Sequence, residues 1–368
     1  MGYMVSMGYG RTLIGRRAAP TAVLALALLV SYASPAAANR YLPKKGKTYH
    51  GVSDTGDVSD FRAFKRQVDA HPALLNAFLH WDVPVAPTLE RADQVDARLV
   101  VSLSTRDPAS PKPEKTPRAI AEGHGDRYIL RYNEAIANSG QVAYLRLFGE
   151  MNGHWNPYCA FNADGSRRGR SHSTRQFKKA WRRFVIITRG GKRRGVNRRL
   201  RRQGMPRIYR AHSNGARVYR RRDVPRRLRH AKVAFLWTPQ TVGSPNVSGN
   251  RPRNYWPGGR YVDWVGADIY AKFESFGFRH LTPFYRRWDN KPFVIGEYSP
   301  WDNDYDGSFV RRLFKWGRQH GRTRMLLYYQ GFAPNDPHEI HHYGGARRAL
   351  RRILDRDRYD PYAPGTRD

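Results

Sequence analysis

The sequence is poor in cysteine and in acidic residues. Its 368 residues include a single cysteine, Cys159, so no disulfide can form within the chain. The fold must therefore rest on its hydrophobic core alone. Aspartate and glutamate number 30 against 66 lysines and arginines, which gives a formal net charge of +36. No cysteines and histidines have the spacing of a zinc site, and we expect neither a metal nor a cofactor.

Two features that could carry chemistry are interpreted here as structural. His338, His341 and His342 have a spacing that a metal site could use, but no clear helical pattern frames them. We interpret them as a histidine cluster in a loop. For Cys159, a buried structural thiol is favoured over a residue that lines a cleft.

Long apolar runs are absent apart from residues 22–30, which Arg11, Arg16 and Arg17 precede and the small residues 34–38 follow. This order is typical of a secretory signal peptide. The run is too short to cross a membrane, which takes about 20 apolar residues. We predict cleavage near Ala38, a mature domain over residues 39–368, and a secreted or envelope-associated protein; a twin-arginine signal is the less favoured route of export.

The positive charge concentrates between Arg167 and Arg229 and is carried mostly by arginine. Such a field attracts polyanions. For an exported protein we expect acidic glycans or anionic cell-envelope polymers as partners, and no nucleic acid. Stacking on bases needs aromatic residues among the cations, and only Tyr209 and Tyr219 interleave with the arginines of residues 192–230. A solvated arginine-rich face without a partner explains the charge equally well.

Apolar runs of β type alternate with amphipathic helical patterns along the chain. The expected strands are 49–54, 74–81, 97–104, 142–149, 232–238, 262–269, 292–298 and 323–330. The clearest helices are 58–70, 125–138, 174–189, 308–319 and 345–355. Eight strands alternating with helices predict an α/β fold, a single (β/α)8 barrel. Residues 193–230 fit this alternation badly, and we interpret them as a basic elaboration before the fifth strand.

Two of the expected strands run directly into a glutamate. Glu150 follows the fourth strand and Glu297 follows the apolar part of the seventh. Barrel enzymes carry their chemistry at this end of the strands. Two carboxylates suit glycoside hydrolysis, since one protonates the leaving oxygen while the other attacks the anomeric carbon. Chance would explain the glutamates alone, but tryptophans and tyrosines also gather at the strand ends, where their faces can stack on sugars.

Around these glutamates the sequence resembles glycoside hydrolase family 26, which β-mannanases dominate. Its hallmark of an arginine-led strand before Glu-Met-Asn-Gly-x-Trp matches Arg146 followed by Glu150-Met151-Asn152-Gly153-His154-Trp155. Further blocks in the same order are Ala180-Trp181-Arg182, Leu236-Trp237-Thr238-Pro239, Tyr255-Trp256-Pro257-Gly258, Tyr261 to Tyr270, and Lys291 to Glu297. The likeness spans residues 49 to 335.

The resemblance implies a retaining, endo-acting β-glycanase with Glu150 as general acid/base and Glu297 as nucleophile. It implies that the hydroxyl of Tyr270 orients Glu297 and that Arg146 lies beneath the site. The substrate-binding positions that it implies are Arg146, Asn152, Trp155, Trp237, Asp268, Tyr270 and Tyr298. We expect a polysaccharide as the partner, a β-mannan or a related β-glycan, neutral or anionic, and a protein that acts as a monomer.

One position departs from the family pattern. A histidine usually stands immediately before the acid/base, and this chain has Gly149 there. Asn152, His154 and His80 are candidates to fill the space. The departure keeps a second interpretation open, in which the barrel binds carbohydrate or envelope polymer without cleaving it. Retention of both glutamates argues against that alternative.

Overall fold

The computed structural model describes residues 41–53, 56–106, 114–208, 224–333 and 335–366. The described residues all belong to one compact unit. The expected signal peptide, residues 1–38, lies outside the described residues, as do residues 209–223 of the basic segment. Within the described ranges, no helix is long and apolar enough to cross a membrane.

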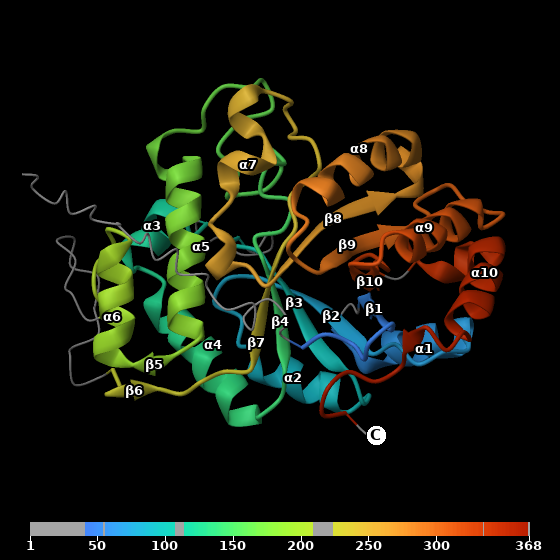
Figure 1. Ribbon diagram of the computed structural model, residues 1–368, viewed down its shortest axis with the longest axis horizontal. Coiled ribbons are helices and arrows are strands. Elements are labelled where there is room, and N and C mark those ends of the chain that lie inside the picture. Colours follow the sequence, from blue (N-terminus) through green and yellow to red (C-terminus); the bar gives the residue numbers. More distant parts are fainter. Residues whose placement is uncertain (1–40, 54–55, 107–113, 209–223, 334, 367–368) are drawn as a thin grey trace, which may run out of the picture. The chain divides into compact units, whose positions relative to one another are not determined.

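Eight parallel strands close into a barrel, as the sequence predicts (Figure 1). Closure is made by β1 and β10, which pair from Tyr49↔Met325 to Val52↔Tyr328. A short ninth strand, β11 (Tyr359–Asp360), adds to the start of β1. The barrel strands in order are β1 (Thr48–Ser53), β2 (Leu74–Leu79), β3 (Arg98–Leu103), β4 (Ala143–Leu147), β7 (Val233–Trp237), β8 (Trp264–Tyr270), β9 (Phe293–Ser299) and β10 (Thr323–Tyr328).

Helices lie between the strands along the chain. Those that the sequence predicts are α1 (Val58–Val68), α4 (Asp126–Ser139), α5 (Thr174–Thr188), α9 (Ser308–Gln319) and α10 (Gly344–Leu354). Those that it misses are α2 (Ala86–Asp93), α3 (Pro117–Glu122), α6 (Arg193–Arg202), α7 (Pro252–Tyr255) and α8 (Glu274–Arg287). Their patterns are weak for identifiable reasons, since α8 contains Pro283 and α6 is mostly arginine.

The described part of the basic elaboration contains a helix and lies beside a short antiparallel strand pair. After β5 (Gly191–Lys192) the chain forms α6, and it returns through β6 (Arg227–Leu228), which pairs antiparallel with β5. Residues 193–202 of the elaboration therefore form a helix, in which Val196 and Leu200 are fully buried. Two apolar residues one turn apart suffice to dock a short helix whose remaining surface is charged.

The side chains of the barrel strands contribute to two separate hydrophobic cores. One fills the interior of the barrel with side chains that include Tyr49, Leu74, Val100, Tyr144 and Trp264. The other, much larger, lies between the outward faces of the strands and the helices. Successive residues of a strand face opposite sides of the sheet. Every second side chain therefore points into the barrel, and the side chains between them pack against the helices.

A β-bulge in β9 breaks this alternation at one place. Ile295 pairs with Leu326 and Tyr298 with Tyr328. Between these two pairs β9 advances by three residues and β10 by only two. The same extra residue occurs opposite β8, where Ala267 and Ile269 are the partners. Bulges re-aim side chains and are frequent next to active sites. Here Gly296 and Glu297 both stand opposite the single residue Asp268.

Candidate active site

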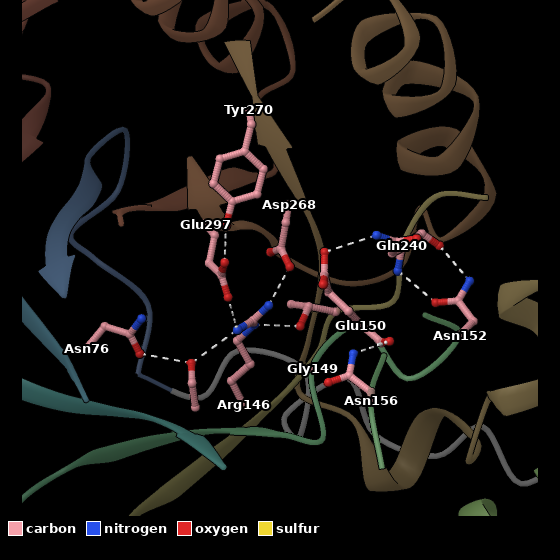
Figure 2. A network of polar contacts seen from close by, with 12 residues as sticks. Asn76, Arg146, Gly149, Glu150, Asn152, Asn156, Gln240, Asp268, Tyr270 and Glu297 are labelled. Atoms are coloured by element: carbon pink, nitrogen blue, oxygen red, sulfur yellow. Dashed lines mark hydrogen bonds and ion pairs between the residues drawn. The ribbon is translucent and has the colours of Figure 1, made fainter. Parts of the chain in front are cut away.

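Arg146 on β4 is the centre of a buried polar network at the C-terminal ends of the strands (Figure 2). Its Nη1 donates to Oε1 of Glu297 at 2.5 Å, and its Nη2 donates to the carboxylate of Asp268. Its Nε donates to the Thr238 hydroxyl at 2.8 Å. The side chain is 3% exposed, so its charge is balanced by these partners rather than by water.

Glu297 is held from two sides. Besides the bond from Arg146, it accepts a hydrogen bond from the hydroxyl of Tyr270 on its second oxygen (Figure 2). Tyr270 ends β8, the strand beside β9, which brings its hydroxyl to the neighbouring carboxylate. The bulge requires a glycine before Glu297, because a Cβ at Gly296 would lie 2.6 Å from Oδ1 of Asp268.

Glu150 stands in a rigid loop after β4. Its backbone N–H donates to the carbonyl of Thr238 at 2.8 Å, and both Phe148 and Glu150 have left-handed backbone angles, φ 51° and 49°. Such angles cost a non-glycine residue about 1–2 kcal/mol. The carboxylate accepts hydrogen bonds from Nε2 of Gln240 and Nε1 of Trp155, each at 3.2 Å.

Three carboxylates share one buried cation in this site. Burial, and then the negative charge of Glu297, raise the pKa of Glu150 above its usual value. Burial also raises the pKa of Asp268, and the charges of Glu297 and Glu150 add to the effect against the opposing charge of Arg146. One guanidinium faces three carboxylates in this buried site, and the two raised pKa values follow from that imbalance. A raised pKa at Glu150 favours its protonated form, which is the form that a general acid requires.

Gly149 explains how Arg146 reaches its partners. A Cβ at residue 149 would lie 2.7 to 3.0 Å from three atoms of the guanidinium group. The space beside Glu150 that a side chain would occupy is therefore filled by Arg146. Gly149 does not have a left-handed backbone, so it is this neighbour and not the chain's conformation that excludes a side chain.

None of the proposed substitutes for the missing histidine fills that space. Asn152 exchanges hydrogen bonds with the backbone of Gln240, at 2.9 and 3.0 Å. Nδ1 of His154 lies 3.3 Å from the hydroxyl of Ser244. The carbonyl of His80 accepts a hydrogen bond from Tyr128. That expectation is corrected: the guanidinium of Arg146 takes the position.

Three of the seven substrate-binding positions lie in the interior of the protein. Asn152, Trp237 and Tyr298 have no exposed surface. Asn152 braces the loop that carries Gln240. Trp237 lies in the outer core, its ring 4.9 Å from that of Trp256, because its position on β7 faces the helices. These placements correct the prediction that the three side chains contact substrate.

Tyr298 faces the helices because of the bulge. Strict alternation from Val294, which faces the interior, would turn Tyr298 inward as well. The extra residue in β9 turns it outward instead, where its hydroxyl lies 2.6 Å from Nε2 of the buried His50. The same extra residue leaves Glu297, rather than Tyr298, at the inner mouth.

The remaining predicted positions gather at the mouth of the barrel. Arg146, Asp268 and Tyr270 surround Glu297, and Trp155, which is 52% exposed, contacts Glu150. Residues that the sequence did not single out are also present. Gln240 bonds Glu150, while the hydroxyl of Ser102 accepts from Arg146 at 3.2 Å. The sequence signals for these two residues are a polar side chain within β3, Ser102, and a polar side chain shortly after β7, Gln240.

Further aromatic rings lie on the Glu297 side of the site. Trp301 contacts the ring of Tyr270, with centroids 5.3 Å apart, and Nζ of Lys272 lies 4.6 Å above Trp301. Tyr329 contacts Phe332, which is 60% exposed. Exposed aromatic surface beside buried carboxylates is suited to stacking on sugar rings.

The histidine cluster is divided in two. His338 is buried, and its Nδ1 lies 2.6 Å from the hydroxyl of Ser299, behind Tyr270. His341 and His342 lie in a short 3₁₀ helix with Glu339, and among the described residues these three form the one group whose donor atoms could converge on a metal, within 4.8 Å of one another. Cys159 is buried, as expected.

Substitution of Gly149 by alanine is expected to disturb catalysis more than folding. The added methyl must push the guanidinium of Arg146 away from Glu297, at a cost of about 1–3 kcal/mol in the free energy of unfolding. Rates on glycan substrates should fall at least about tenfold, since a displacement of this size in a positioning group costs up to about 10²-fold. Gly195→Ala, whose methyl meets nothing within 4 Å, is the matched control. Unchanged kinetics in Gly149→Ala would contradict the role given to Arg146.

Comparison with known proteins supports the fold. No family model matches the chain, and no curated protein sequence matches it. Among solved structures, a mannanase from Bacillus subtilis is 16% identical, with a TM-score of 0.52 over 90% of this chain and 89% of its own. The GH26A protein from Muricauda sp. is 14% identical, with a TM-score of 0.52 over 85% of this chain and 91% of its own.

A modular endo-β-1,4-mannanase from Cellulomonas fimi is likewise similar. It is 14% identical, with a TM-score of 0.52 over 85% of this chain and 72% of its own. The first two structures also match this chain over most of their own length. At such identities the likeness concerns the fold. The chain therefore folds as a (β/α)8 barrel, and its fold is similar to that of solved structures named as mannanases.

Proposed function

We propose that the protein is a secreted, retaining glycoside hydrolase that cleaves a polysaccharide from within the chain. Glu150 is the general acid/base and Glu297 the nucleophile. The main support for the proposal is that burial and the charge of Glu297 raise the pKa of Glu150, as a general acid requires. Arg146 and Tyr270 hold Glu297 in place.

The proposed reaction uses the chain's own groups alone. Glu297 attacks the anomeric carbon while Glu150 donates its proton to the leaving oxygen, and a glycosyl ester forms on Glu297. Besides burial, the negative charge of Glu297 raises the pKa of Glu150, and esterification removes that charge. The pKa of Glu150 therefore falls, so Glu150 remains ionised after giving up its proton and can take a proton from the attacking water in the second step. When the carboxylate of Glu297 is regenerated, hydrogen bonds from Tyr270 and Arg146 stabilise its negative charge.

The substrate class that we propose is a β-mannan or a related β-glycan, neutral or anionic. The similarity of the barrel to structures named as mannanases supports this choice. The exposed rings of Trp155 and Phe332 offer stacking surface near the two carboxylates. We propose that the protein acts as a monomer, and that the basic surface discussed below binds a separate anionic partner.

The test is a substrate panel with a stereochemical readout. Mature protein is incubated with β-mannans, β-glucans, xylans and acidic glycans, and new reducing ends are counted. Glu90→Gln, at an exposed carboxylate of α2, is the matched control for Glu150→Gln. Proton NMR of the first product should show the β-anomer from a β-linked substrate. Binding that survives without any cleavage across the panel would favour the non-catalytic alternative.

The alkaline limb of the pH profile should depend on Gln240. The hydrogen bond from Gln240 stabilises the ionised form of Glu150 and lowers the pKa of this acid. Gln240→Met removes the bond, so the pKa of Glu150 should rise and the protonated acid should persist to higher pH. The fall of kcat/KM on the alkaline side would then begin at a higher pH than in the unmodified protein. A shift to lower pH, or none, would contradict Glu150 as the general acid.

A further inference from the structure

The charge of the chain is segregated as well as large. Between residues 165 and 222 the sequence contains no aspartate or glutamate, while lysine and arginine recur throughout. The described part of this stretch forms α5 and α6, which lie side by side in Figure 1. Nη1 of Arg182 on α5 donates to Oε1 of Gln203, just after α6, at 2.9 Å.

One face of α6 anchors the helix and the other presents guanidinium groups. Val196, Asn197 and Leu200 are buried, and Oδ1 of Asn197 accepts from the backbone of Ile208 at 3.0 Å. The exposed arginines of α6 used in the following argument are Arg194, Arg198, Arg201 and Arg202. We call these four residues the α6 arginine face.

The charges of the α6 arginine face lower the stability of the helix that carries them. Arg194 and Arg198, like Arg198 and Arg202, are like-charged neighbours four residues apart, which destabilise a helix. The first turn contains Arg193 and Arg194 and no acidic residue, although the positive end of the helix dipole lies there. A helix selected for stability alone would carry glutamate at several of these positions.

Two less exposed arginines nearby have acidic partners. Arg183 of α5 pairs with Asp126, and Arg189 pairs with Asp263. Within the described ranges, no carboxylate pairs with a residue of the α6 arginine face. Burial and the positive charges of Arg189 and Arg198 lower the pKa of Arg199, which places this neighbour in a positive field. Among the residues that the structure describes, the face is therefore a dense array of cations with no carboxylate partner.

We propose that the α6 arginine face binds a linear phosphodiester polymer of the cell envelope, of the poly(glycerol phosphate) kind. Guanidinium groups match phosphate oxygens with two parallel hydrogen bonds. Residues four apart on a helix are about 6 Å apart along its axis. A six-bond repeat of such a polymer spans roughly 7 Å when extended, by analogy with the reach of a polypeptide chain. Successive phosphates can thus meet successive arginines.

The composition of the face disfavours single-stranded nucleic acid. Residues 192–208 contain no aromatic side chain, and sequence-tolerant binding of such strands relies on stacked aromatic rings. A glycerol phosphate chain has no rings to stack and is held by its phosphates alone. The face is also separate from the cleft, because Arg146 and Glu297 lie at the C-terminal ends of β4 and β9 while α6 packs on α5. The bound polymer would retain the protein near its substrate, and this binding does not depend on hydrolysis.

The test compares two variants that lose the same charge. The first is R194Q/R198Q/R201Q/R202Q, and the second is R286Q/R287Q/R348Q/R352Q, at exposed arginines of α8 and α10. Binding of the full mature proteins to poly(glycerol phosphate) is measured by calorimetry from 0.05 to 0.3 M NaCl. The first variant should bind about 10³-fold more weakly than the unmodified protein, by the usual strength of four cations near an anionic surface. The slope of log K against log salt should become shallower by about 3.

The second variant and a lysine variant complete the design. The second variant should bind almost as the unmodified protein does, and equal weakening of both variants would overturn the proposal in favour of net charge alone. R194K/R198K/R201K/R202K should keep the salt slope but bind more weakly, since lysine cannot form the paired hydrogen bonds. Tighter binding of DNA than of poly(glycerol phosphate), or equal binding of a polyuronate, would also overturn the assignment. The glutamine variant should melt at the same or a higher temperature, because repulsion within α6 is relieved.

Discussion

Replacement of Glu297 by glutamine is expected to lower kcat by about 10⁴-fold or more on every glycan that the unmodified protein cleaves. The amide cannot attack the anomeric carbon to form the glycosyl ester. Its amide oxygen can still accept a hydrogen bond from Arg146, and its amide nitrogen can donate to the hydroxyl oxygen of Tyr270, so folding should be preserved. Reducing-end assays at substrate saturation measure the rate, and circular dichroism checks the fold. A residual rate above about one hundredth would contradict Glu297 as the nucleophile.

The matching change at Glu150 separates the two roles. Glu150→Ala should also fail on natural glycans, because their leaving oxygen needs a proton. On an aryl glycoside with an acidic phenol as leaving group, however, the first step needs no proton donor. Added azide should then restore turnover in Glu150→Ala by attacking the glycosyl enzyme, whereas Glu297→Gln forms no such intermediate to be attacked. Rescue of Glu297→Gln under these conditions would reverse the assignment.

Replacement of Arg146 by methionine is expected to lower the free energy of unfolding by about 3–5 kcal/mol, the usual cost when one partner of a buried ion pair is removed. Asp268 and Glu297 have side chains only 2% and 12% exposed, so neither can be rehydrated in place. Asp268, whose pKa burial already raises against the charge of Arg146, should instead take up a proton, with a folded-state pKa above that of the unfolded chain. The deficit should therefore be smallest at acidic pH and should grow as the pH rises through this folded-state pKa.

Urea denaturation across a pH series measures this effect. Arg98→Met is the matched control, because Arg98 is also buried but its partner Asp93 is 60% exposed and can return to water. We expect the control to lose clearly less stability at neutral pH and to show little dependence on pH. Asp268→Asn in the Arg146→Met background should recover part of the loss, since one buried carboxylate is removed. A loss below about 1 kcal/mol in Arg146→Met would mean that the site is far wetter than the structure shows.

The sequence alone determined the barrel, because its signals are local. Each strand is a short run of apolar residues bounded by polar ones, and the eight predicted strands differ from the observed ones by a few residues at their ends. The two glutamates were placed at strand ends for the same reason. A short helix such as α6 escaped prediction because two buried residues, Val196 and Leu200, make no visible pattern among arginines.

Only the tertiary structure decided which side chains reach the site. The bulge in β9 exists because β8 and β10 pair around an extra residue, and pairing partners are distant in sequence. It turned Tyr298 toward the helices and set Glu297 against Arg146. The role of Gly149 likewise depends on where the guanidinium of Arg146 lies in space. Strand identity follows from hydrophobic patterning along the chain, whereas register, bulges and buried ion pairs are set by contacts across it.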